Sequence, residues 1–327
     1  MTAQTIVTES FLQEKENQKS KLLIIGDLII DRTIYCTVSK ISPEAPVPVA
    51  MIEPNGIVET PGGAGLAASY ASKNNIDSIF LTVVGNDKET FIDNCKIDYE
   101  QLEYKSPLNP RKTRYIDIKS NHQLLRADTD AMIDKSIFHM VTFQDAFLKL
   151  FNKILKEENI SGIVILDYCK GIFNRPRIAY EIINIAADKG IQTYVDTRRH
   201  DLSIFSGVNI LKLNDKEFTY AKNSCNPRYL GLDYLVVTHG KDGASIFQTK
   251  NNIFTNLENF KSNLGNYSGT PDATGCGDVF DVTFCENWCI NKNNIVNSLK
   301  IAVDKATKFA YTPIEERLNV NTRTKNK

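Results

Sequence analysis

Residues 163–195 read IVILDYCKGIFNRPRIAYEIINIAADKGIQTYV and contain a strand, a helix and a second strand in succession. The apolar runs at 163–166 and 193–195 predict buried strands, because parallel strands covered on both faces are continuously apolar. Between them, isoleucines and alanines at helical spacing begin at Pro176 and end before Gly190. Proline suits the start of a helix and glycine the residue past its end, so the stretch predicts one β–α–β unit.

The same alternation continues on both sides of this unit. Apolar runs predict further strands at 22–25, 79–84, 210–213 and 235–238. Helical spacing predicts helices around 147–155 and over 295–311. Repeated β–α units predict an α/β fold, with a mostly parallel central sheet, helices on both of its faces and right-handed crossovers.

Two stretches interrupt this rhythm and predict a small β lid. Residues 33–60 mix β-forming residues with prolines, which are confined to edge strands. Residues 112–126 (KTRYIDIKSNHQLLR) alternate in polarity and carry four basic residues. We expect antiparallel strands that stand off the main sheet, within one domain at 21–315 between polar tails at 1–20 and 316–327.

Composition excludes several classes of function. Lys+Arg and Asp+Glu both number 39 among 327 residues, and a net charge of zero disfavours non-specific nucleic-acid binding. No apolar run approaches the ~20 residues of a membrane span, and the polar start does not resemble a secretory signal. The seven cysteines are odd in number and widely spaced, which disfavours a disulfide framework. We therefore expect a cytoplasmic protein with no membrane or nucleic-acid partner.

The strongest local motif is DATGCGD at 272–278, directly before an apolar helical pattern. One interpretation makes Asp278 a general base, with the amides of Gly275, Cys276 and Gly277 stabilising a phosphoryl group in transfer. The alternative is a glycine-rich turn with an acidic residue in the first helical turn, for which ordinary capping suffices. These residues alone leave the two interpretations about even.

A second motif, Asn214-Asp-Lys-Glu217, follows the strand at 210–213. Ligands of open α/β sheets bind at the carboxyl ends of strands, where an amide and a carboxylate suit Mg²⁺ that carries nucleotide phosphates. The alternative is a helix start in which Asn214 and Glu217 form a capping box. Taken alone, this motif favours the cap.

Three weaker motifs follow other predicted strands. Thr238-His-Gly240-Lys-Asp-Gly243 suits a turn near a nucleotide, and equally a plain hairpin. Asp31 and Lys170 lie just beyond two strand ends, where they suit either a sugar site or an exposed turn.

The stretch PGGAGLAA at 61–68 fits a glycine pair that binds sugar at the start of a helix. Its Gly63-x-Gly65-x-x-Ala68 also matches a dinucleotide fingerprint, with Asp87 at about the right distance, but prolines replace the clean strand that the fingerprint needs. The chain contains no GxxxxGK[ST] motif, which excludes a P-loop kinase.

In this order the motifs resemble the ribokinase-like carbohydrate kinases, and most closely the D-glycero-β-D-manno-heptose 7-phosphate kinases. The matching stretches run from residue 22 to 281 and are GDLIIDR, SKISPEAPVPV, TPGGAGLAASYAS, NHQLLRAD, DYCKG, LKLNDKEF and DATGCGD. The resemblance implies the ribokinase-like fold, with a β lid that pairs two subunits into a homodimer. It also implies transfer of the γ-phosphoryl group of ATP, with Mg²⁺ and with or without a monovalent cation, to the anomeric hydroxyl of a heptose 7-phosphate.

The resemblance also assigns roles by position. Asp278 is the implied base, with residues 275–277 as the anion hole. The implied nucleotide and Mg²⁺ residues are Asn214 and Glu217, with Lys212, Thr238, Gly240 and Gly243 also on the nucleotide side. The implied sugar-phosphate residues are Asp31, Gly62, Gly63, Arg126 and Lys170.

Two of the departures from the family bear on the substrate and on the nucleotide side of the site. Leu66 stands where the family usually has an asparagine that binds sugar, and an unpaired hydroxyl there costs about 1–3 kcal/mol. VDTRRHD replaces the family's DPKGTD, which puts Arg198 and Arg199 near the nucleotide. A kinase for another sugar, a catalytically silent binding protein on the same scaffold and a nicotinamide-dependent oxidoreductase remain alternatives.

Overall fold

The computed structural model describes residues 19–85, 99–103, 109–130, 135–263, 271–312 and 316–317. Most of the two predicted tails and Asp87 lie outside these residues. No helix in the described part of the chain has the length and apolar character needed to cross a membrane.

A nine-stranded sheet forms the centre of the molecule, in the order β13-β12-β11-β10-β9-β8-β1-β4-β5. All six strands predicted from apolar runs are present in it. The strands are β1 (Lys21–Gly26), β4 (Ser78–Val84), β5 (Tyr99–Glu103), β8 (Ile160–Asp167), β9 (Gln192–Thr197), β10 (Ile210–Asn214), β11 (Tyr234–Thr238), β12 (Ala244–Lys250) and β13 (Ile253–Phe260). The pairs β11–β12 and β12–β13 are antiparallel and the other six pairs are parallel, which confirms the predicted mostly parallel sheet.

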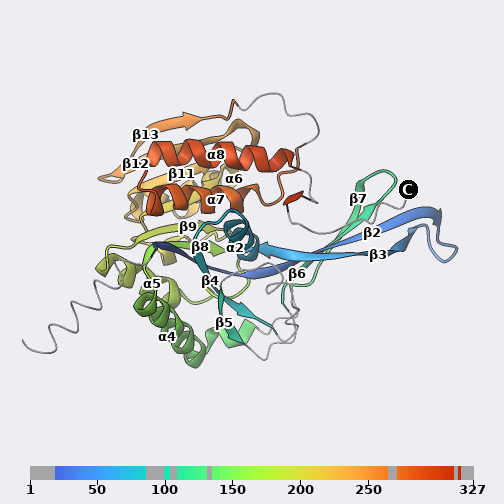
Figure 1. The fold of residues 1–327 in the computed structure, drawn as a ribbon, viewed down its shortest axis with the longest axis horizontal. Coiled ribbons are helices and arrows are strands. Elements are labelled where there is room, and N and C mark those ends of the chain that lie inside the picture. The colour runs from blue at the N-terminus through green and yellow to red at the C-terminus, as the bar shows by residue number, and fades with distance from the viewer. Residues whose placement is uncertain are drawn as a thin grey trace, which may run out of the picture.

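Helices cover both faces of this sheet (Figure 1). The helices of one face are α4 (Val141–Glu157), α5 (Pro176–Asp188) and α6 (Asp215–Ser224). Those of the other face are α2 (Ala64–Lys73), α7 (Cys276–Cys285) and α8 (Ile295–Tyr311). Each set packs on the sheet in its own apolar cluster. Pro176 begins α5 and Gly190 follows it in a left-handed conformation, as predicted.

Short helical segments complete the described secondary structure. The 3-10 turns are η1 (Lys135–His139), η2 (Ser203–Phe205), η3 (Pro227–Tyr229) and η4 (Gly240–Asp242), and a π-helical segment, η5 (Glu286–Ile290), follows α7.

The lid is a separate four-stranded sheet that projects from one side of the body (Figure 1). Its strands are β2 (Leu28–Ile41), β3 (Pro48–Gly63), β6 (Arg111–Asp117) and β7 (His122–Asp128), in the order β3-β2-β6-β7. The proline-containing strand β3 is an edge strand, as proline requires. The expectation of purely antiparallel strands was wrong, because the central pair β2–β6 is parallel and joins two antiparallel hairpins.

The passage from the main sheet into the lid is direct. Only Asp27 separates β1 from β2, so Asp31 lies within a lid strand and not in a turn at a strand end. On the return path, β3 runs into α2 at Gly63, whose φ of 56° is left-handed. Two of the segments that join the lid to the body therefore carry Asp31 and the Gly62–Gly63 pair.

Candidate active site

Three parts of the fold meet at the carboxyl ends of the parallel strands. Tyr168 follows β8, and its hydroxyl donates to Asp278 of α7. Lys112 of the lid strand β6 lies over the Tyr168 ring, with Nζ 5.5 Å from the ring centroid. The candidate site is thus at the edge of the sheet where open α/β sheets bind ligands.

The first turn of α7 is built on glycine. Gly275 precedes the helix with a φ of 80°, and no side chain caps the helix. The Cys276 amide donates to Ala273 O at 3.2 Å, so one of the three predicted anion-hole amides already has a partner. A helix start without a side-chain cap favours an anion. The anion hole itself stays a prediction.

Asp278 lies one residue beyond these glycines and is 6% exposed. Its Oδ1 accepts a hydrogen bond from Tyr168 at 2.5 Å. Its pKa is raised to about 7, because burial and the neighbouring Asp196 raise it by more than Tyr168, Lys212 and Arg198 lower it. A carboxyl group that titrates near neutrality suits a general base.

A buried group of charges lies behind the first turn of α7. Lys212 Nζ is 2.7 Å from Asp196 Oδ2 and 3.3 Å from Asp281 Oδ1, and all three side chains are at most 3% exposed. Burial by itself lowers the pKa of Lys212, but Asp196 and Asp281 outweigh it and raise the pKa. Nζ is 3.4 Å from where a Cβ on Gly277 would lie. Lys212, a predicted nucleotide residue, therefore places its charge directly behind the predicted anion hole.

Asn214 and Glu217 form the capping box that their spacing suggested. Asn214 Oδ1 accepts from the Glu217 amide at 3.0 Å, and Glu217 Oε2 accepts from the Asn214 amide at 2.8 Å. The other carboxylate oxygen of Glu217 accepts a hydrogen bond from Arg198. Both predicted metal ligands thus have structural partners of their own.

The fit of these residues to Mg²⁺ is correspondingly poor. Within the described ranges, no group of three or more His, Cys, Asp or Glu residues could hold a metal ion. Asp196 Oδ1 is buried without a hydrogen-bond partner in the same ranges, but one free oxygen does not make a site held by protein alone. Mg²⁺ therefore stays a prediction, and no step below depends on it.

The predicted turn near a nucleotide is the connection from β11 to β12. Thr238 pairs with Asn214 across β10 and β11, which brings these two predicted nucleotide residues side by side. Gly240 and Gly243 have φ angles of 58° and 91°, and a Cβ on Gly243 would lie 1.9 Å from Phe260 O. Backbone geometry alone explains these glycines, so the nucleotide and hairpin interpretations both remain.

The predicted sugar residues are adjacent at the base of the lid. A Cβ on Gly62 would lie 2.2 Å from Asp31 Oδ2, so Gly62 leaves room for this carboxylate. The other oxygen, Oδ1, accepts from Arg114 Nη1 at 2.8 Å. Gly63 begins α2 beside them. The structure thus brings Asp31, Gly62 and Gly63 together, although it does not test their role.

The same region explains two features of the sequence, the leucine at position 66 and the glycine pattern that resembles a dinucleotide fingerprint. Leu66 is 7% exposed, and a Cβ on Gly275 would lie 2.3 Å from its Cδ2. Leu66 therefore packs against the start of α7. The strand that leads into the glycine pair is the antiparallel lid strand β3, which is not the parallel strand that a dinucleotide fingerprint needs.

The two predicted phosphate-binding cations already have acidic neighbours. Arg126 Nε donates to Asp128 Oδ1 at 2.8 Å, and the Lys170 ammonium is paired with Asp130. The Lys112 ammonium forms no ion pair with the described residues, although the Asp31 carboxylate acts on it. Burial lowers the pKa of Lys112, Asp31 opposes this shift, and Arg126, Lys170 and Arg114 lower the pKa further. These four residues, Lys112, Arg114, Arg126 and Lys170, are called the cation cluster below.

Sequence reasoning missed several residues of this site. Tyr168 stands in the quoted DYCKG motif, where an aromatic residue directly after a strand end was an available signal. Asp196 and Asp281 interrupt the apolar patterns of YVDT and VFDVTF, which is the sign of a buried, paired charge. Lys112 carried no such signal, because its direction depends on the register of β6.

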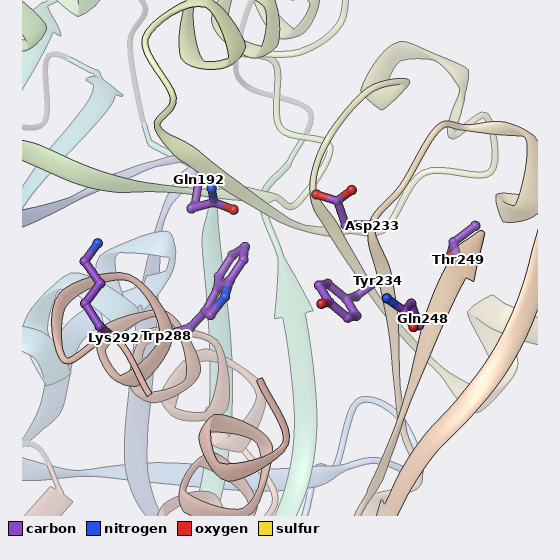
Figure 2. Close-up of a pocket in the computed structure, with 7 residues that line it drawn as sticks. All are labelled: Gln192, Asp233, Tyr234, Gln248, Thr249, Trp288 and Lys292. Atoms are coloured by element: carbon purple, nitrogen blue, oxygen red, sulfur yellow. The ribbon is translucent and has the colours of Figure 1, made fainter. Parts of the chain in front are cut away.

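A separate cavity of about 440 Å³ opens at the opposite edge of the sheet (Figure 2). It includes Gln192 and Tyr234, the first residues of β9 and β11, together with Trp288 of η5. None of the predicted site residues lines it.

Comparisons with known proteins agree with this architecture. No family model matches the chain. The bifunctional protein HldE of Campylobacter jejuni (strain RM1221) is 28% identical over 291 residues, which covers 84% of this chain and 58% of that protein. HldE of Bradyrhizobium sp. (strain ORS 278) is 32% identical over 214 residues, covering 63% and 41%. The chain thus spans less than two thirds of these curated relatives.

Solved structures show the same fold at low identity. Phosphofructokinase-2 from Escherichia coli, in complex with substrates and products, has a TM-score of 0.64 and 15% identity, covering 89% of this chain and 93% of that one. Ribokinase from Giardia lamblia has a TM-score of 0.63 and 14% identity, covering 92% and 97%.

The chain therefore has the ribokinase-like fold, as predicted. Among curated proteins its sequence relatives include the HldE proteins, which confirms the resemblance seen in the motifs.

The Lys212→Met variant tests the buried charge group. The substitution leaves Asp196 and Asp281 buried without their cation, and such a loss costs about 3–5 kcal/mol. We expect a large fall in the urea midpoint of unfolding. The control Lys189→Met removes an exposed lysine at the end of α5 and is expected to change stability by less than about 0.5 kcal/mol. Equal midpoints for the two variants would contradict this role.

Proposed function

We propose that this chain is an ATP-dependent sugar-phosphate kinase whose acceptor is the anomeric hydroxyl of a heptose 7-phosphate. The observation that carries the proposal is the buried carboxyl group of Asp278 at the glycine-rich start of α7. Its pKa of about 7 lets it be deprotonated at neutral pH and still accept a proton.

The proposed reaction needs one proton acceptor and one anion site. The acceptor hydroxyl gives its proton to Asp278, and its oxygen forms a bond to the γ-phosphorus of ATP. The bond from that phosphorus to the β–γ bridging oxygen breaks, and ADP leaves. Amides at the start of α7 and the positive charge of Lys212 behind them stabilise the charge on the phosphoryl group.

The nucleotide is proposed to lie over the ends of β10 and β11. Asn214 and Thr238 are paired there, and the Gly240–Gly243 turn follows. Arg198 holds Glu217 at the same edge. A cation that accompanies the phosphates would have to displace Arg198 before it could use Glu217.

The acceptor is proposed to lie between Asp31 and Asp278. Asp31 would accept hydrogen bonds from sugar hydroxyls, and the backbone amides of the Gly62–Gly63 pair would donate hydrogen bonds to them. The cation cluster supports an acceptor that already carries a phosphate, because Arg126, Lys170 and Arg114 repel the half-buried Lys112 ammonium and Asp31 is the acidic group that opposes them. A phosphate would offset this repulsion and a neutral sugar would not, so the cluster favours a sugar phosphate over a free sugar.

Activity assays distinguish this proposal from two alternatives, a kinase for another sugar and a binding protein without activity. A different sugar acceptor is detected by a panel of sugars and sugar phosphates with ATP. A silent binding protein is indicated by the absence of ATP turnover with every member of the panel.

The Asp278→Asn variant tests the proposed base. We expect phosphorylation of a heptose 7-phosphate to fall by roughly 10²–10⁴-fold, because the amide cannot accept the proton. ATP binding, measured by calorimetry, should be retained. The control Asp188→Asn, at an exposed position at the end of α5, should keep full activity. Substantial turnover by Asp278→Asn would remove Asp278 from the mechanism.

We also propose that two copies of the chain pair through their lids. Several large apolar side chains on the lid are exposed, among them Ile41 (62%), Met51 (56%) and Leu125 (58%). Exposed apolar side chains on one projecting element favour a protein interface, and a second lid is the occupant that the family resemblance implies. The same contact would hold the lid strands that carry Asp31 and Lys112.

The Met51→Asp variant tests the lid interface. A charge within an apolar interface is costly, so we expect the molar mass from light scattering to fall from two chains to one. The control Ile253→Asp changes a similarly exposed residue (62%) on β13 and should leave the mass unchanged. A wild-type protein of single-chain mass would contradict the proposal outright.

A further inference from the structure

The loop that carries Tyr168 is held rigidly by a buried carboxylate. Asp27 is 4% exposed, and its Oδ2 accepts from the amides of Tyr168 and Lys170, each at 3.0 Å. Between them, Cys169 has a left-handed φ of 60°, which a non-glycine residue adopts only when its surroundings enforce it. Asp27 joins β1 to the lid strand β2, so the loop is fixed at the junction of body and lid.

Three contacts fix the side chain of Tyr168. Its hydroxyl donates to Asp278 Oδ1 at 2.5 Å. Lys112 Nζ from the lid and the guanidinium carbon of Arg198 from the nucleotide side each lie 5.5 Å from the ring centroid. A cation over an aromatic face attracts the ring, so Tyr168 is held both from the lid side and from the proposed nucleotide side of the site.

We propose that Tyr168 is a positioning residue, whose hydroxyl holds Oδ1 of Asp278 so that Oδ2 is directed at the acceptor hydroxyl. This inference rests on the proposed function, in which Asp278 is the base. Tyr168 itself touches neither phosphorus nor the transferred proton. One carboxylate oxygen is used for orientation and the other for chemistry, as expected when a base is held by a neighbouring group.

The hydrogen bond also has an electrostatic consequence. Burial raises the pKa of Tyr168 well above its ordinary value, so the phenol remains a donor at working pH. A donor stabilises the charged carboxylate, and its removal therefore raises the pKa of Asp278. The other charged groups that act on Asp278 are Asp196, Lys212 and Arg198, with Asp281 one turn along the helix. None of these is altered when only the phenolic oxygen is removed.

Tyr168→Phe isolates this role, because phenylalanine keeps the ring between its two cations. With ATP and the sugar phosphate, we expect kcat to fall by roughly tenfold or more and the KM for ATP to change by less than about twofold. The acid limb of kcat/KM should move to higher pH by about one unit, which is the size of one lost hydrogen bond to a charged group. Tyr180→Phe, at an exposed position on α5, should match the wild type.

An acid limb that stays in place in Tyr168→Phe would overturn the inference, even if activity falls, since lost packing alone does not move it. The second measurement needs no turnover. The ¹³C chemical shift of the Asp278 carboxyl carbon is followed against pH by NMR in protein labelled at aspartate, and it gives the pKa of the carboxyl group. The signal is identified by its absence in Asp278→Asn.

The two measurements separate the inference from the proposed function. We expect the carboxyl pKa to be higher in Tyr168→Phe than in the wild type, and an unchanged value would overturn the inference. An inactive wild type with a shifted carboxyl pKa would contradict the kinase proposal and the positioning role that rests on it, and would support only the hydrogen bond between Tyr168 and Asp278. The assignment by variant also separates Asp278 from Asp27, whose pKa burial likewise raises to about 7.

Discussion

The ion pairs of Lys212 with Asp196 and Asp281 connect the sheet to the helix that carries the proposed base. They join β10 to β9 and to α7 where water is excluded. Buried pairs of this kind contribute little net stability, but breaking one is costly, so they fix one arrangement of the elements. With α7 fixed, its glycine-rich first turn lies in front of the ammonium and Asp278 lies in the same dry region. The raised pKa of Asp278 follows from this burial.

Local patterns predicted most of the framework. The strand–helix alternation, the start of α5 at Pro176 and the lid all depend on periodicity and on proline and glycine, which act over a few residues. The capping box of Asn214 and Glu217 was also readable from spacing, and its formation limits these residues as metal ligands. The placement of Asp31 was not readable, because nothing local shows that β1 continues into a lid strand.

The candidate site was predicted only in part, because local patterns show neighbours in sequence and not contacts between distant segments. Asp278 could be named from DATGCGD, since its neighbours in sequence are also its neighbours in space. Tyr168 is 110 residues from Asp278, and its hydrogen bond depends on the register of the whole sheet. Lys112 reaches the ring only because β6 pairs parallel with β2. The substrate side of the site is therefore the part that sequence patterns describe least.

The proposed mechanism requires that burial at the start of α7 makes Asp278 a base that titrates near neutrality. The most direct test is the pH dependence of kcat/KM for the wild-type chain with ATP and a heptose 7-phosphate. Activity should be lost as pH falls through about 7, because the carboxyl group then becomes protonated. A rate that stays level down to pH values near 4, where an ordinary carboxyl group titrates, would contradict the claim.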